Sequence, residues 1–133
     1  MKPTQEQIRS EPAGRQADKW VLEYVFGCTL QSLTGDAECR VWVGRKGEGI
    51  CQESEEPRFS THPIPFHQML AEMEKQEYDY ELYKDTRTDN SEVVYSAKFH
   101  TLGRPCESNI SIFEAGVRAA LLAVMGEKKV RTD

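Results

Sequence analysis

The pattern of apolar residues near the C-terminus predicts the strongest element of the chain. Within residues 108–126, apolar side chains recur at three- and four-residue intervals and share one face of an α-helix: Phe113, Val117, Ala120, Leu121 and Val124. Ser111 and Glu114 have capping-box spacing, and Gly126 follows the last apolar turn as a stop residue. The second half of this helix is apolar nearly all round. We therefore expect it to be covered by its own sheet and, if the chain pairs, by a second subunit.

Two further helices are predicted upstream of it. The first begins near Gln16 and ends at Gly27, and its apolar face carries Ala17, Val21, Tyr24 and Val25, with Trp20 beside it. The second has Pro65 in its first turn, and its buried stripe consists of Phe66, Met69, Leu70 and Met73. Both patterns are typical of helices that pack one face against a core.

Short strand patterns lie between these helices. Residues 40–43 and 50–52 predict a hairpin around a glycine-rich turn at residues 44–49. Residues 78–82 and 93–99 alternate in strand fashion on either side of a polar loop at residues 85–91. The order helix, hairpin, helix, strand, strand, helix predicts an α+β fold in which a small antiparallel sheet is layered with helices, an α-β-α sandwich. We expect one domain over residues 15–127, after a polar arm at residues 1–14 and before a polar tail at residues 128–133.

Composition narrows the classes of function. The chain has 133 residues, of which 38% are hydrophobic and 29% charged, and its formal net charge is −5. An acidic balance argues against general nucleic-acid binding, which normally uses a basic face. No run is long and apolar enough for a membrane span, and the start of the chain lacks a secretory signal. We expect a cytoplasmic protein that does not associate with membranes.

The residues that usually carry catalysis or metal binding show no motif. The cysteines lack C-x-x-C spacing, and the histidines are not spaced as a ligand set (Cys28, Cys39, Cys51, Cys106; His62, His67, His100). No nucleophile is accompanied by a recognisable base. We therefore expect no enzyme activity, no metal and no cofactor, and the sequence leaves open whether these cysteines and histidines do more than pack.

Three stretches together resemble a known family. They are Ala17–Gly27, Phe59–Lys75 and Ile112–Val124, and their order and spacing are similar to those of the phage ABA sandwich family, small α-β-α proteins of bacteriophages and prophages. Arg118 occupies the family's arginine position, whereas His62 replaces a usual aspartate and Gly116 a packing residue. The resemblance implies residence in the cytoplasm of a bacterial host, and it supplies no catalytic residues.

A phage protein without catalytic motifs is expected to act by binding. One hypothesis is an anti-defence sponge that sequesters a nucleotide second messenger of host immunity, with ligand contacts from Trp42, Arg45, Lys46, Arg58 and Arg118. The alternatives are an accessory protein that binds a host protein, for instance through the acidic residues Glu53, Glu55 and Glu56, and a small phage protein with neither role. We expect a homodimer or higher homo-oligomer, because a small domain with an apolar closing helix can bury more surface by pairing.

Overall fold

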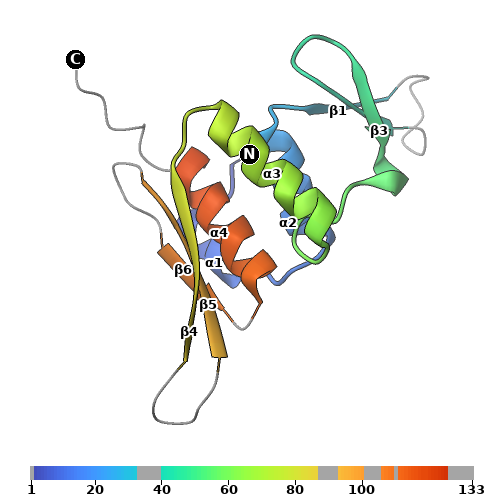
Figure 1. Ribbon diagram of the computed structural model, residues 1–133. Coiled ribbons are helices and arrows are strands. Elements are labelled where there is room, and N and C mark those ends of the chain that lie inside the picture. The colour runs from blue at the N-terminus through green and yellow to red at the C-terminus, as the bar shows by residue number, and fades with distance from the viewer. Residues whose placement is uncertain (1, 33–39, 87–92, 101–105, 110, 126–133) are drawn as a thin grey trace.

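Four helices and two small antiparallel sheets make up the computed structural model, which describes residues 2–32, 40–86, 93–100, 106–109 and 111–125 (Figure 1). The helices are α1 (Gln5–Ser10), α2 (Arg15–Trp20), α3 (Pro63–Lys75) and α4 (Ile112–Met125). Helix α2 continues as η1 (Val21–Val25) in wider, π-helical turns, and a single 3-10 turn, η2 (Glu53–Glu55), precedes α3. The strands are β1 (Thr29–Ser32), β2 (Arg40–Val43), β3 (Gly49–Gln52), β4 (Tyr80–Thr86), β5 (Val93–Phe99) and β6 (Cys106–Asn109).

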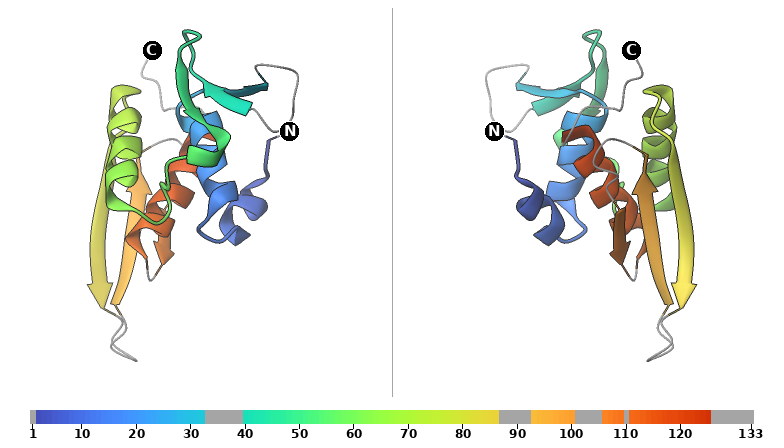
Figure 2. Two further views of the ribbon diagram at one scale, coloured as in Figure 1. Left: turned by 90° about the vertical axis from the view of Figure 1, so that its right-hand side faces the viewer. Right: turned by 90° about the vertical axis from the view of Figure 1, so that its left-hand side faces the viewer.

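Helix α4 lies at the centre of this arrangement. It packs on strands β5 and β6 on one side, and on η1, α1 and α3 on the others. Figure 2 shows the β4–β6 sheet as an outer layer beside the helices, while the β1–β3 sheet stands apart from it at the other end of the molecule. The α+β class predicted from the sequence is thus confirmed, with two small sheets packed against helices.

The register of the larger sheet explains which of its residues are buried. Strands β4, β5 and β6 pair in that order, all antiparallel, and Tyr80 is opposite Phe99 while Leu82 is opposite Ala97. Directly opposite residues share a face of a sheet. Phe99 and Ala97 are fully buried, so this face is the one that packs on α4.

Helix α4 confirms the expectation that it is covered on several sides. Residues Ala115–Val117 and Ala119–Ala123 are all buried. Gly116 lies against the ring of Phe66 from α3, where a side chain would collide with that ring. The elements that cover α4 belong to the same chain, so its apolar surface no longer argues for a second subunit.

Three elements of the structure were not predicted from the sequence: α1, β1 and β6. Residues Gln5–Ser10 of the expected polar arm form α1, whose Ile8 is 2% exposed and joins the core. Strand β1 adds a third strand to the predicted hairpin, and β6 occupies residues that had been assigned to the approach and first turn of the last helix. The predicted stop residue Gly126, the tail at residues 128–133 and most of the predicted loop at residues 85–91 lie outside the described residues.

Two helices end beside each other, and this places the candidate site. At the end of η1, Gly27 has a φ of 72° and the N–H of Cys28 donates to the carbonyl of Leu22 at 2.9 Å. At the end of α3, Glu77 has a φ of 69° and the N–H of Tyr78 donates to the carbonyl of Met73 at 2.9 Å. The left-handed residue in each case stops the helix and turns the chain away.

Candidate functional site

A cavity of about 600 Å³ lies between the β2–β3 hairpin, helix α3 and the end of η1. Its size suits a ligand of nucleotide dimensions, since small-molecule sites usually enclose 300–1,000 Å³. One wall is apolar and comes from η1, β3 and the segment before α3: Leu22, Phe26, Cys28, Ile50, Pro57 and Phe59. The opposite rim is polar and comes from the hairpin turn and α3: Arg45, Lys46, Glu48, Gln68, Glu72, Lys75 and Gln76.

The apolar wall is built around two aromatic rings. The centroids of Phe26 and Phe59 are 5.5 Å apart and the ring planes are tilted by 31°. Ile50 adds an aliphatic side chain that is 46% exposed, which is unusual for so large an apolar group. Burial raises the pKa of the Cys28 thiol, with Glu48 contributing in the same direction, so this thiol lines the cavity as a neutral group. Phe59 is 1% exposed and backs the ring of Phe26, so the surface that the wall offers to a planar ligand comes chiefly from Phe26 and Ile50.

The polar rim carries three cations. Arg45 and Lys46 lie on the turn between β2 and β3, which is closed by hydrogen bonds from Gly44 N–H to the Glu48 carbonyl and from Gly47 N–H to the Gly44 carbonyl, at 2.8 and 3.0 Å. Gly47 has a φ of 82°, a conformation that suits glycine. Lys75 faces them from the last turn of α3. Among the described residues, neither Lys46 nor Lys75 has an ion-pair partner, so both charges are available to a ligand.

The carbonyl of Val25 joins the hairpin turn to the end of α3 beside the cavity. It accepts a hydrogen bond from Arg45 Nη2 at 3.3 Å and another from Gln76 Nε2 at 2.6 Å. Gln76 Nε2 also donates to Glu72 Oε2 at 2.7 Å. The Arg45 guanidinium lies directly over Gly27, where any side chain would collide with it. The glycine that ends the first long helix therefore also makes room for the arginine of the hairpin.

The cavity contains only some of the residues that the sequence singled out. Arg45 and Lys46 line it, as hypothesised for ligand contacts. Trp42 does not: it is 3% exposed, it belongs to the hydrophobic core, and its Nε1 donates to Glu56 Oε2 at 2.6 Å. Arg58 is exposed and is not part of the lining.

Arg118 has a structural role instead. Its Nη2 donates to the Glu11 carbonyl at 3.0 Å and to Glu114 Oε1 at 2.6 Å. These bonds tie α4 to the segment that follows α1. Arg118 is not among the residues that line the cavity, so its position does not support the hypothesis that it binds the ligand.

The acidic loop is largely neutralised by its neighbours. Lys19 Nζ lies 2.6 Å from Glu53 Oε2 and 3.0 Å from Glu56 Oε2, and Arg40 Nη2 lies 2.7 Å from Glu53 Oε2. The hydrogen bond from Lys19, with Arg40 as a further donor, lowers the pKa of Glu53. These pairs hold the β1–β3 sheet against α2, which leaves less free acidic surface for a basic partner.

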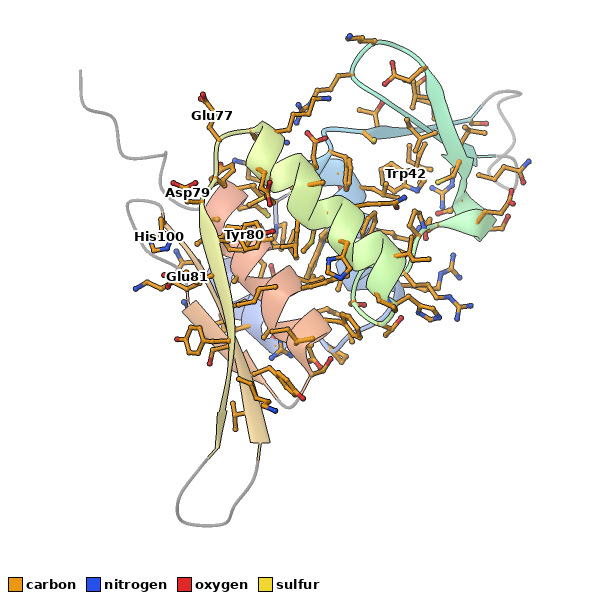
Figure 3. The ribbon with its side chains drawn as sticks, viewed as in Figure 1. Trp42, Glu77, Asp79, Tyr80, Glu81 and His100 are labelled. Carbon is orange, nitrogen blue, oxygen red and sulfur yellow. The ribbon has the colours of Figure 1, made fainter. Side chains whose placement is uncertain are left out.

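A second, more open hollow lies at the start of β4 and has the opposite character. It is lined by Glu74, Tyr78, Asp79, Tyr80, Glu81 and His100, four of which Figure 3 labels along the edge of the sheet. The Tyr80 hydroxyl donates to Glu74 Oε1 at 2.7 Å, and burial, together with this carboxylate, raises the pKa of Tyr80 to about 12. A hollow with three carboxylates disfavours an anion, so the cavity beside α3 is the better candidate for an anionic ligand.

The residues from α3 and the phenylalanines were missed by sequence reasoning. Glu72, Lys75 and Gln76 occupy the polar face and end of a helix, where such residues are common and give no signal. Phe26 was assigned to no role, although it directly precedes the predicted stop residue Gly27. Only the fold shows that these residues, about 30 positions away from the hairpin turn, share a cavity with Arg45.

In the described ranges, no three residues among the histidines, cysteines, aspartates and glutamates come together as a metal-ligand group. None of the helices described has the length and apolarity of a membrane span. Comparison with protein-family models, curated proteins and solved structures found no match for this chain.

Proposed function

We propose that this protein is a non-catalytic binding protein that holds a small nucleotide-derived anion in the cavity between the β2–β3 hairpin and α3. The observation that carries the proposal is the pairing of two surfaces in one cavity of about 600 Å³. An apolar, partly aromatic wall faces a rim that carries the side chains of Arg45, Lys46 and Lys75.

Each surface suits one half of a nucleotide. The apolar wall around Phe26 offers a contact surface for a planar base. The cationic rim attracts phosphate oxygens, for which arginine and lysine are the usual partners. With the phage resemblance, this site supports the hypothesis of a sponge that sequesters a nucleotide signal of host immunity.

Binding of a host protein is the weaker alternative. Of the acidic residues that would carry it, Glu53 and Glu56 are held in ion pairs with Lys19 and Arg40, which leaves the exposed Glu55. A basic partner would have to compete with these internal cations. A pull-down from host lysate tests this alternative directly, because a protein that binds only a small ligand does not retain a stoichiometric partner.

Native mass spectrometry and thermal-shift measurements test the proposed ligand class. The purified protein is incubated with cyclic dinucleotides, cyclic mononucleotides, nucleoside monophosphates and ADP-ribose derivatives. We expect a mass shift and a raised melting temperature with at least one of them, since a ligand that binds only the folded state stabilises it. No mass shift and no stabilisation at high ligand excess would refute the proposal.

Substitutions then locate the site. Lys46→Ala and Lys75→Ala should each weaken binding about tenfold, which corresponds to about 1.4 kcal/mol for the loss of one charge-assisted contact. Lys84→Ala is the matched control, because Lys84 is an exposed cation on β4, outside the cavity lining. Equal loss of affinity in the control would place the ligand elsewhere.

A further inference from the structure

Glu72 and Gln76, which line the cavity at the end of α3, offer a ligand hydrogen-bond acceptors only, whereas Arg45 and the two lysines supply donors elsewhere in the lining. Gln76 Nε2 donates to the Val25 carbonyl and to Glu72 Oε2, which uses both of its N–H groups. A carbonyl and a carboxylate can only accept, so the amide of Gln76 cannot be turned the other way. The groups of this pair left over for a ligand are Glu72 Oε1 and Gln76 Oε1, and no hydrogen bond from the described residues reaches either atom.

The C-terminal ends of two helices also favour a hydrogen-bond donor in the ligand. Helix η1 ends at Val25 and α3 ends at Lys75, so both C-terminal ends lie at the cavity. The C-terminus of a helix carries a partial negative charge. This charge and the carboxylate of Glu72 both favour a ligand group that donates hydrogen bonds and disfavour one that accepts them.

The cations lie at the rim, on the hairpin turn and the exposed last turn of α3. Lys46 and Lys75 are both exposed, whereas Glu72 and Gln76 are half-buried. A ligand with a phosphate and a heterocycle therefore has one favourable orientation, with the phosphate at the rim and the edge of the heterocycle against Glu72 and Gln76.

From the free oxygens of Glu72 and Gln76 we infer that the ligand presents an edge with neighbouring N–H donors to these two residues, and that among nucleobases the site selects guanine. Guanine has the N1–H and the 2-amino group side by side on its Watson–Crick edge, which matches a carboxylate acceptor. Hypoxanthine lacks the 2-amino donor, and xanthine replaces it with an acceptor. This inference rests on the proposed function, because it names the base that the same cavity would take.

The test compares guanosine, inosine and xanthosine 5′-monophosphates, which differ at position 2 of the base, by isothermal titration calorimetry. A site built to accept hydrogen bonds from a ligand rejects an analogue that cannot donate them. We expect the wild-type protein to bind the guanine nucleotide at least tenfold more tightly than the hypoxanthine one, and the xanthine one more weakly still.

Glu72→Gln is the decisive variant, since it keeps the shape of the side chain and removes its charge. It should lower the affinity for the guanine nucleotide about tenfold and that for the hypoxanthine nucleotide by less, because hypoxanthine donates to the carboxylate from N1–H alone, so that the preference shrinks. Glu6→Gln, the same change at an exposed glutamate of α1 outside the cavity lining, is the matched control and should keep the preference.

The outcomes separate the two proposals. Equal binding of all three nucleotides, or a guanine preference that Glu72→Gln leaves unchanged, would overturn the inference and leave the nucleotide site intact. If none of the three nucleotides binds and the wider panel of nucleotides also gives no shift, both proposals are wrong. A preference for the xanthine nucleotide would show that the groups contacting position 2 of the base donate hydrogen bonds, and it would overturn the inference as well.

Discussion

Replacing Gly116 by alanine should destabilise this protein, although alanine is the best helix former and glycine a poor one. In the interior of a helix the change from glycine to alanine normally gains about 1 kcal/mol. At Gly116 the added Cβ would lie 2.5 Å from Cζ of Phe66, against the 3.5–4.0 Å of an ordinary carbon–carbon contact. The ring or the helix must therefore move by about 1 Å.

The surroundings of Phe66 make that movement costly. Its ring is 2% exposed and packs edge-on against Phe113, with the centroids 5.1 Å apart. Overpacking of a core costs about 1–3 kcal/mol. After the gain in helix propensity is subtracted, we expect Gly116→Ala to lower the free energy of unfolding by about 1 kcal/mol, and the melting temperature by about 4 °C.

Urea denaturation of four variants tests this reasoning. Ala71→Gly, at an exposed position of α3, measures the propensity difference in the same chain and should cost about 1 kcal/mol. In a Phe66→Leu background the clash is relieved, so adding Gly116→Ala should be neutral or stabilising. Refutation would come from a Gly116→Ala protein at least as stable as the wild type, or from an equal effect of the substitution in both backgrounds.

Three other predictions follow from the backbone and the buried polar groups. Glu77→Gly should raise the free energy of unfolding by about 1 kcal/mol in chemical denaturation, because it relieves a side chain at a φ of 69°; a loss of stability would contradict this. Burial raises the pKa of Asp18 above its ordinary 3.8, against the lowering effect of its hydrogen bonds from Ser60, so the folded state binds this proton more tightly than the unfolded chain. The contribution of Asp18 to the free energy of unfolding therefore falls as the pH rises through the range just above 3.8. The melting temperature of Asp18→Asn should rise relative to that of the wild type over this pH range. A difference in melting temperature that does not change with pH would contradict the prediction. Trp42→Phe should cost about 2 kcal/mol in denaturant titrations, because it leaves the buried carboxylate of Glu56 without its indole donor, and adding Glu56→Gln should recover part of the loss.

The sequence pattern was most informative where burial follows a simple period. The four residues predicted as the buried stripe of the middle helix are the four that α3 buries, and β5 spans the predicted residues 93–99. Helix α1 was missed because its six residues bury only Ile8, which is too little for a period to appear. Strand β1 was missed because three of its four residues are exposed and its pairing with β2 is visible only in the fold.

The residues of the candidate site were also only partly predictable from the sequence. The cations of the hairpin turn could be predicted, since a glycine-rich turn with Arg45 and Lys46 is a recognisable anion-binding feature. The polar residues at the end of α3 could not, because the position of Gln76 in the site depends on its hydrogen bond to the carbonyl of Val25, 51 residues earlier. Trp42 was a reasonable candidate for stacking on a ligand, yet a large aromatic residue in a strand packs into the core more often than it faces a ligand.

The attachment of the β2–β3 hairpin determines which residues of its tip can be changed. The inner face of the β1–β3 sheet is anchored by Trp42 in the core, whereas residues 45–48 at the tip are exposed and touch the helices chiefly through Arg45. Residues 46 and 48 of the tip can therefore be exchanged with little effect on folding, provided that Arg45 and the left-handed Gly47 are retained. A library confined to these two positions would change the charge at the rim of the cavity while Glu72 and Gln76 stay the same.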